Sequence, residues 1–164
     1  MTILYPYLII FGVKKWEKVG RNNRINPVDE KGRVSFPHDL RKVLSPDGNG
    51  KIILTRGPEK CIWVFSEREW KNFENAFREK GVGDFKMRTL MRLLLGDAVE
   101  TEFDNYGRIL IPGHLAEYAG IKKECRFVRM FAWVEIWDPE KYEETIEKVK
   151  EEINYDEYFG NFKF

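Results

Sequence analysis

The fold of this chain is decided by the segment Asp29-Glu-Lys-Gly-Arg33-Val-Ser-Phe-Pro37, which returns as Asp104-Asn-Tyr-Gly-Arg108-Ile-Leu-Ile-Pro112. Both segments follow the pattern Asp-x-x-Gly-Arg-x-x-x-Pro, and the second copy follows the first at a constant offset of 75 residues. Further on, Phe65-Ser66 matches Trp137-Asp138 at an offset of 72. The loop Ser45-Pro-Asp-Gly-Asn-Gly50 accounts for the difference, since insertions are tolerated in loops. The chain is therefore predicted to be an internal duplication.

Each repeat is predicted to run strand, tight turn, strand, short helix, two strands and helix. Gly32 and Gly107 stand where the turn requires a positive φ. Pro37 and Pro112 each open the short helix, because the first helical turn has no use for the missing N–H. The expected fold class is α+β and β-rich, with two repeats packed together and short flanking helices.

At 164 residues the chain is short for two independent domains but long enough for two packed repeats that share a core. With 43% hydrophobic residues it is expected to be globular. The predicted divisions are 1–19, an N-terminal extension outside the repeat pattern; 20–82, the first repeat with a trailing helix; 83–96, a linking helix; 97–153, the second repeat with a trailing acidic helix; and 154–164, a C-terminal tail. The extension is interpreted as a mis-assigned start, with an exposed apolar arm or a packing element as the alternatives. The linking helix is expected to be a core helix, because one of its faces carries Met87, Leu90, Met91, Leu94 and Leu95; contact with DNA through Arg88 and Arg92 is the less favoured alternative.

Charge is distributed unevenly along the chain, although the formal net charge is only +1. From Lys14 to Lys42, nine basic residues stand against four acidic ones, a net charge of +5. From Glu135 to Glu157, ten acidic residues stand against three basic ones, a net charge of −7. This distribution favours an anionic partner at the front of the chain.

Nothing in the sequence indicates a metal site, a cofactor or a catalytic residue. Cys61 and Cys125 lie in apolar, strand-like runs without a second ligand nearby, so both are expected to be buried, reduced thiols. The apolar run Ile3–Val13 is too short to cross a bilayer, and its cations follow it rather than precede it. A cytoplasmic protein with no membrane partner is expected.

The turn Asp29–Arg33 presents a guanidinium just beyond a glycine. A guanidinium offers a rigid fork of donors that matches phosphate oxygens or the O6/N7 edge of guanine, so Arg33 is a candidate DNA contact. Lys31 on the same turn, with Arg41 and Lys42 soon after, would bring four positive charges close together. The alternative is that Asp29 and Arg33 form an ion pair that pins the hairpin, and the two roles are compatible.

Residues Val28–Lys42 resemble the core of the SpoVT/AbrB-like DNA-binding domain, whose dimers interleave hairpins into a swapped barrel. Three further segments, Arg88–Ala98, Asp104–Pro112 and Val134–Asp138, resemble the MraZ family of regulators linked to the bacterial division and cell-wall gene cluster. The resemblance covers about residues 20 to 150.

This resemblance implies a sequence-specific transcriptional regulator of double-stranded DNA, cytoplasmic and nucleoid-associated. It implies a ring-like homo-oligomer that places many Asp-x-x-x-Arg turns against repeated promoter boxes, where avidity compensates for weak single contacts. Asp29, Arg33, Asp104 and Arg108 are the residues that match the family's motif.

The two copies differ in charge. Where the first has Arg41-Lys42 the second has Ala116-Glu117, and where the first has Lys31 the second has Tyr106. The sequence therefore suggests that the first repeat does most of the DNA binding and that the second mainly builds the oligomer.

Two other functions compete with this prediction. A methyltransferase is disfavoured, because the chain has no Gly-x-Gly loop between a strand and a helix, and because His38 and His114 do not occupy equivalent positions in the repeats. We therefore do not predict an enzyme. An antitoxin-like protein-interaction module of the same fold remains an alternative, since the acidic helix from Asp138 to Glu152 could receive a basic partner.

Overall fold

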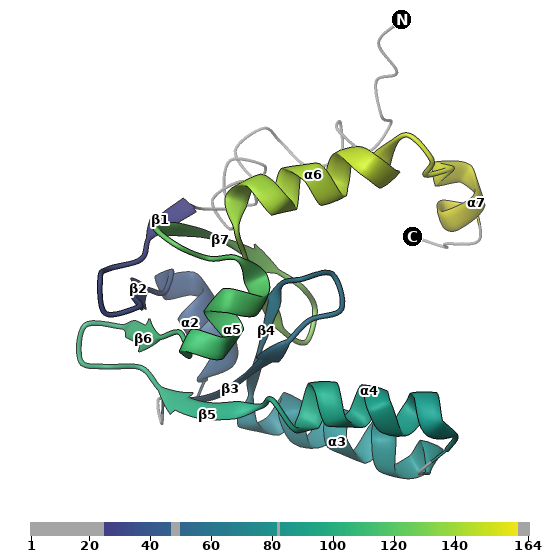
Figure 1. The fold of residues 1–164 in the computed structure, drawn as a ribbon, viewed down its shortest axis with the longest axis horizontal. Helices are drawn as coiled ribbons and strands as arrows, with labels where there is room; N and C mark the ends of the chain where they lie inside the picture. Colours follow the sequence, from purple (N-terminus) through teal and green to yellow (C-terminus); the bar gives the residue numbers. More distant parts are fainter. Residues whose placement is uncertain (1–24, 47–49, 82, 161–164) are drawn as a thin grey trace, which may run out of the picture.

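The computed structural model describes residues 25–46, 50–81 and 83–160 (Figure 1). The strands are β1 (Ile25–Pro27), β2 (Arg33–Ser35), β3 (Lys51–Arg56), β4 (Ile62–Ser66), β5 (Val99–Glu102), β6 (Arg108–Leu110), β7 (Glu124–Arg129) and β8 (Val134–Trp137). The helices are α2 (His38–Leu44), α3 (Glu67–Lys80), α4 (Phe85–Leu95), α5 (Gly113–Ala119), α6 (Pro139–Lys150) and α7 (Tyr155–Phe159). Residues 1–19, the predicted extension, lie outside the described residues.

The two repeats are interleaved around an internal twofold axis. One antiparallel sheet has the strand order β1-β7-β8-β4-β3-β5, and β2 pairs with β6 in a second, two-stranded sheet. Val34 lies opposite Ile109, and Trp63 lies opposite Glu135, so each of these pairs joins equivalent positions of the two repeats. The first strand of each repeat pairs with the third strand of the other, as β1·β7 and β5·β3. This exchange confirms the predicted α+β fold of the swapped-hairpin type.

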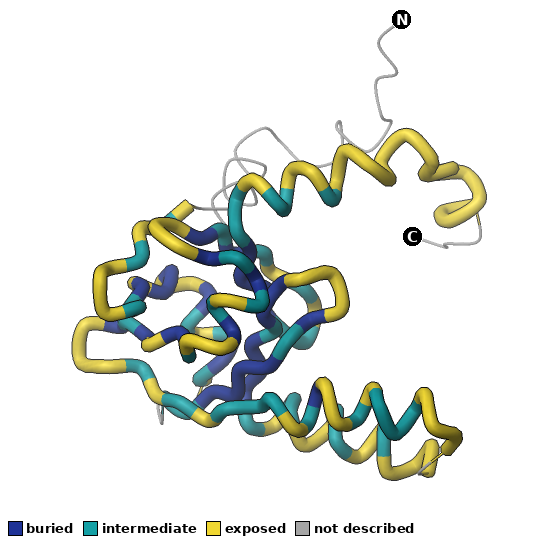
Figure 2. The backbone as a smooth tube through the Cα atoms, viewed as in Figure 1, coloured by how far each residue is buried: buried dark blue, intermediate teal, exposed yellow. Residues whose placement is uncertain are grey.

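Both repeats contribute to one hydrophobic core. Its fully buried members include equivalent pairs such as Leu40 with Leu115 and Val34 with Ile109. Figure 2 shows this buried material in the middle of the molecule, between the sheet and the two short helices. Because the core is shared, neither repeat could bury its apolar residues alone.

The short helices begin where the two prolines were expected to start them. Pro37 and Pro112 precede α2 and α5 with nearly the same backbone angles, φ −54° and ψ 134° against φ −56° and ψ 135°. Gly120 ends α5 in the left-handed conformation at φ +68°, which a residue with a Cβ rarely adopts. The hydroxyl of Ser66 caps α3 by accepting a hydrogen bond from the backbone N–H of Glu69.

Glu135 holds together an aromatic cluster on the outer face of the large sheet. Its side chain is buried and accepts hydrogen bonds from three indole N–H groups, those of Trp137 at 2.8 Å, Trp63 at 3.2 Å and Trp133 at 3.3 Å. The ring centroids of Trp63 and Trp133 lie 5.0 Å apart. The carboxylate therefore joins both repeats close to the twofold axis.

The linking helix is not the core helix that its apolar face predicted. Within that face only Leu94, near the C-terminal end of α4, is buried, and its carbonyl accepts a hydrogen bond from the hydroxyl of Thr55 on β3. Leu90 is 39% exposed. Figure 1 shows the reason: α3 and α4 lie side by side as a hairpin that projects away from the sheet, so only its base reaches the core.

Helices α6 and α7 extend from the opposite side of the molecule (Figure 1). The side chain of Asn154 caps α7, so the segment expected to be a tail contains a short helix. Within the part of the chain that the structure describes, every helix is too short or too polar to cross a membrane.

The two cysteines are buried and unpaired, as predicted. Burial raises the pKa of Cys125 to about 12 and raises that of Cys61 further. Both thiols are therefore neutral at physiological pH and poor nucleophiles.

Candidate nucleic-acid interface

The first turn is held by one carboxylate. Oδ1 of Asp29 accepts hydrogen bonds from the backbone N–H groups of Lys31 and Arg33, both at 2.9 Å, and Oδ2 accepts one from Nε of Arg33 at 2.8 Å. Gly32 has φ +81° and donates its N–H to the Asp29 carbonyl at 2.9 Å. The ion pair leaves the terminal Nη1 and Nη2 groups of Arg33 unused by the aspartate, so the arginine can be positioned by one partner and bind another.

The second turn repeats this geometry. Oδ1 of Asp104 accepts from the backbone N–H groups of Tyr106 and Arg108, both at 2.9 Å, and Oδ2 accepts from Nε of Arg108 at 2.7 Å. Gly107 has φ +73°. The hairpin-pinning ion pair that the sequence allowed is thus present in both copies.

The hydrogen bonds to the aspartates also determine their ionisation. The pKa of Asp29 is lowered, chiefly by the hydrogen bond from the backbone N–H of Arg33. Desolvation, the next-largest effect, opposes this, and the Arg33 side chain and the backbone N–H of Lys31 lower the pKa further. The pKa of Asp104 is lowered for the same reasons, with Arg108 in the corresponding role. Both carboxylates are therefore charged at neutral pH, which keeps the two arginines oriented.

The swapped fold places the two turns together. Beyond the β2·β6 pairing, the N–H of Phe36 donates to the carbonyl of Gly107 at 3.0 Å, and the N–H of Ile111 donates to the carbonyl of Gly32 at 2.9 Å. Figure 1 shows both turns on the same side of the molecule, away from the α3–α4 hairpin. A chain of this fold therefore presents two arginine turns on one face.

Arg41 does not join the cluster of four cations that the sequence predicted around the first turn. A Cβ added to Gly107 would lie only 2.2 Å from Nη1 of Arg41, so this guanidinium lies against the second turn. The reason is the strand exchange: α2 follows β2, and β2 pairs with β6 of the other repeat. Lys31 and Lys42 are exposed, while Ala116, the equivalent of Arg41, packs against the core.

The strongly basic front of the chain is only partly described. Five of its nine basic residues, Lys14 to Arg24, lie outside the described residues. From Asp29 to Lys42 there are four basic residues and three acidic ones. This described segment therefore has only a small surplus of positive charge, so any positive charge concentrated at the turns depends on where the basic side chains lie.

Tyr106, which replaces the Lys31 of the first turn, contributes an aromatic ring to the second turn. Tyr106 is 81% exposed, and the Arg108 guanidinium lies 5.1 Å from its ring centroid. This cation–π contact restricts the arginine further. The sequence analysis did not predict this contact between Tyr106 and Arg108, although residues two positions apart on an extended chain lie on the same side.

Taken together, an interleaved tandem fold and two Asp–Arg turns on one face define a swapped-hairpin protein with a duplicated arginine turn. The family model described as "MraZ protein, putative antitoxin-like" matches this chain twice, over residues 25–93 and 94–158. The chain belongs to the MraZ family. The two matches meet in α4, close to the boundary between the repeats.

Relatives of the family cover most of the chain. A protein named "Transcriptional regulator MraZ" from Treponema denticola is 39% identical over 125 residues, which are 75% of this chain and 84% of the relative. One of the same name from Caldanaerobacter subterraneus subsp. tengcongensis is 41% identical over 117 residues, covering 71% and 79%. One from Pediococcus pentosaceus is 36% identical over 134 residues, covering 82% and 90%.

Proposed function

We propose that this protein is a sequence-specific DNA-binding transcriptional regulator. It binds repeated promoter boxes upstream of the division and cell-wall gene cluster as a ring-like homo-oligomer, in the cytoplasm and associated with the nucleoid. The observation that carries the proposal is the pair of geometrically matching Asp–Arg turns on one face. The relatives named as transcriptional regulators support the same function.

The chemistry of the turns suits DNA. In each turn the aspartate uses Nε of the arginine, and the remaining edge of the guanidinium can donate to phosphate oxygens or to O6 and N7 of guanine. The side chains of Arg33 and Arg108 are 35% and 29% exposed, so part of each is accessible. Because one base contact contributes only about 1–3 kcal/mol of discrimination, useful specificity requires several turns acting together.

Two helix faces with exposed apolar side chains support the oligomer. One is the α4 face, which exposes Phe85, Leu90 and Leu93 and whose helix has three basic residues and no acidic one. The other is the α6–α7 face. Its exposed apolar residues are Ile146, Val149, Ile153, Tyr155, Tyr158 and Phe159. From Asp138 to Glu157, nine acidic residues accompany three basic ones.

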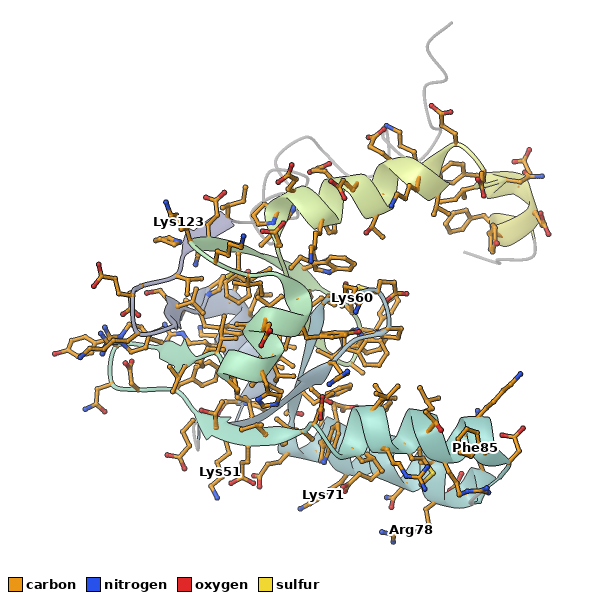
Figure 3. All side chains as sticks on the ribbon, in the orientation of Figure 1. Lys51, Lys60, Lys71, Arg78, Phe85 and Lys123 are labelled. Carbon is orange, nitrogen blue, oxygen red and sulfur yellow. The ribbon has the colours of Figure 1, made fainter. Side chains whose placement is uncertain are left out.

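These faces cannot meet within one molecule, since they lie on opposite sides of it (Figure 1). Figure 3 shows Phe85 at the free end of the α3–α4 hairpin, remote from α6. Apolar faces of opposite charge at opposite ends fit a head-to-tail contact between copies, and such contacts generate rings when the rotation closes. We therefore place α4 of one copy against α6–α7 of the next.

DNA binding is tested by a gel shift and footprint on the DNA upstream of the protein's own operon, at stated salt. Arg33→Ala and Arg108→Ala are each expected to weaken binding about tenfold and to reduce the salt slope by about one. Arg78→Ala, on exposed α3 (Figure 3), is the matched control and should bind like the parent protein.

Binding that is independent of both arginines would contradict the proposal. Weak binding with no sequence preference would favour the antitoxin-like interaction module instead. Binding of adenosylmethionine in calorimetry would favour the methyltransferase.

The oligomer is tested by sedimentation of Leu93→Asp, which puts a charge on the α4 face. We expect a fall in mass at constant protein concentration. Phe131→Asp is the control, because Phe131 is fully exposed at the β7–β8 turn and outside both faces. A monomeric parent protein would refute the assembly.

A further inference from the structure

We propose that the second turn is a composite site: Arg41 from the first repeat and Arg108 from the second act as one basic pair toward an anionic ligand. The inference rests on the proposed function, whose ligand is the DNA phosphate backbone, and it names which residues form each contact. The sequence suggested that the first repeat does most of the DNA binding; with Arg41 added, the second turn carries more positive charge and is the stronger phosphate site.

The guanidinium of Arg41 covers the second turn. A Cβ added to Gly107 would meet Nη1, Cζ and Nε of Arg41 at 2.2, 2.5 and 3.0 Å, so the guanidinium lies directly over this glycine. Gly107 is accordingly buried. At the equivalent Gly32, which is only half-buried, an added Cβ would meet Ile111 O at 3.5 Å and Leu110 Cδ1 at 3.6 Å, and no cation. The two turns thus differ in what covers them.

Arg41 has no charge partner among the residues that the structure describes. Its Nη2 lies 3.1 Å from Nδ1 of His38, a hydrogen-bonding contact but not an ion pair. Its Nε is buried without a hydrogen-bond partner, and within the described residues no carboxylate pairs with it. A partly buried guanidinium without a counter-ion is costly, and an arriving anion would compensate for it. Arg33 and Arg108, by contrast, each have an aspartate.

The two turns also differ in net charge. The segment Asp29–Arg33 carries two basic and two acidic residues and is neutral. The segment Asp104–Arg108 carries one of each, and Arg41 raises it to a net charge of +1. The twofold relation gives the first turn no such addition, since the residue equivalent to Arg41 is Ala116. Phosphate is therefore bound more strongly at the second turn.

A double-mutant cycle tests the composite site, with affinity for the operator DNA measured by fluorescence anisotropy. Arg41→Ala and Arg108→Ala should be strongly non-additive: if each single change weakens binding about tenfold, the double change should weaken it about thirtyfold rather than a hundredfold. Arg41→Ala and Arg33→Ala should be additive. Arg41→Lys, which keeps the charge but loses the fork, should fall between Arg41→Ala and the parent protein.

A gain of function gives an independent test. Ala116→Arg supplies the first turn with the missing cation and should tighten DNA binding several-fold, with a steeper dependence on salt. Amide NMR gives a readout that needs no DNA: Arg41→Ala should shift the amide resonance of Gly107 and leave that of Gly32 in place. Thermal melting confirms that each variant is folded.

The outcomes separate the two proposals. If neither Arg33→Ala nor Arg108→Ala weakens binding, the proposed function is wrong and the composite site falls with it. If Arg33→Ala and Arg108→Ala both weaken DNA binding, but the effect of Arg41→Ala is additive with that of Arg108→Ala, only the composite site is wrong. The same conclusion follows if Arg41→Ala is non-additive with Arg33→Ala instead.

Discussion

Replacing Glu135 with alanine removes the acceptor that three indole N–H groups share. Trp137 is 4% exposed, so its donor, at 2.8 Å from the carboxylate, would be left without any partner. Trp63 and Trp133 are half-buried and bond at 3.2 and 3.3 Å, so water can partly replace the carboxylate there. Most of the lost stability therefore comes from the single deeply buried donor of Trp137 and from the cavity that the shorter side chain would leave.

The size of the effect follows from these contacts. A hydrogen bond to a charged group contributes about 1.5–3 kcal/mol, and the two longer bonds count for less. Loss of the side chain also disrupts packing at the junction of the repeats, so we expect Glu135→Ala to lower the free energy of unfolding by about 3–5 kcal/mol. For a chain of this size that corresponds to a fall in Tm of roughly 6–20 °C.

Guanidinium unfolding at fixed protein concentration, followed by tryptophan fluorescence, measures this loss directly. Glu135→Gln keeps one carbonyl acceptor and should lose roughly half as much. Glu100→Ala is the control, because that carboxylate pairs with Lys51 on the surface and should contribute less than about 1 kcal/mol. A loss below about 1 kcal/mol for Glu135→Ala would refute the view that the carboxylate holds the cluster together.

Two further predictions concern pH and thiol chemistry. Because the pKa values of Asp29 and Asp104 are lowered in the folded state, their ionised forms stabilise the turns above the ordinary value of 3.8 and lose this effect as pH falls through the lowered values. Asp29→Asn with Asp104→Asn should thus reduce stability at pH 7 but not at pH 2, as measured by urea unfolding, and an equal loss at both pH values would contradict this. Cys61 and Cys125 should react with a thiol reagent only after unfolding, so rapid labelling of the native protein would show that they are accessible.

Local features of the fold were predictable because they depend on neighbouring residues. The glycines and prolines of the two turns occupy conformations that their own chemistry favours, and the constant offset between the copies predicted their equivalence. The aspartate–arginine pairing was also visible as one of two open interpretations, since the residues are four positions apart.

Other features depend on tertiary contacts that no local pattern encodes. Arg41 lies four residues after Pro37, so the sequence grouped it with the first turn, but strand exchange carries it to the second. The apolar face of α4 predicted burial because periodicity shows that a face is apolar, not what covers it. Glu135 was counted as one charge in an acidic segment, although three tryptophans from two repeats surround it.

The pairing of Val34 with Ile109 has a consequence for how such a protein can evolve. In a homodimer every substitution appears on both sides of the axis, so the two sides must remain identical. Here both halves belong to one polypeptide, and a mutation in either half alters only that side. Ala116 at the position equivalent to Arg41 is such a difference: the chain retains a symmetric scaffold while the surroundings of its two arginine turns differ.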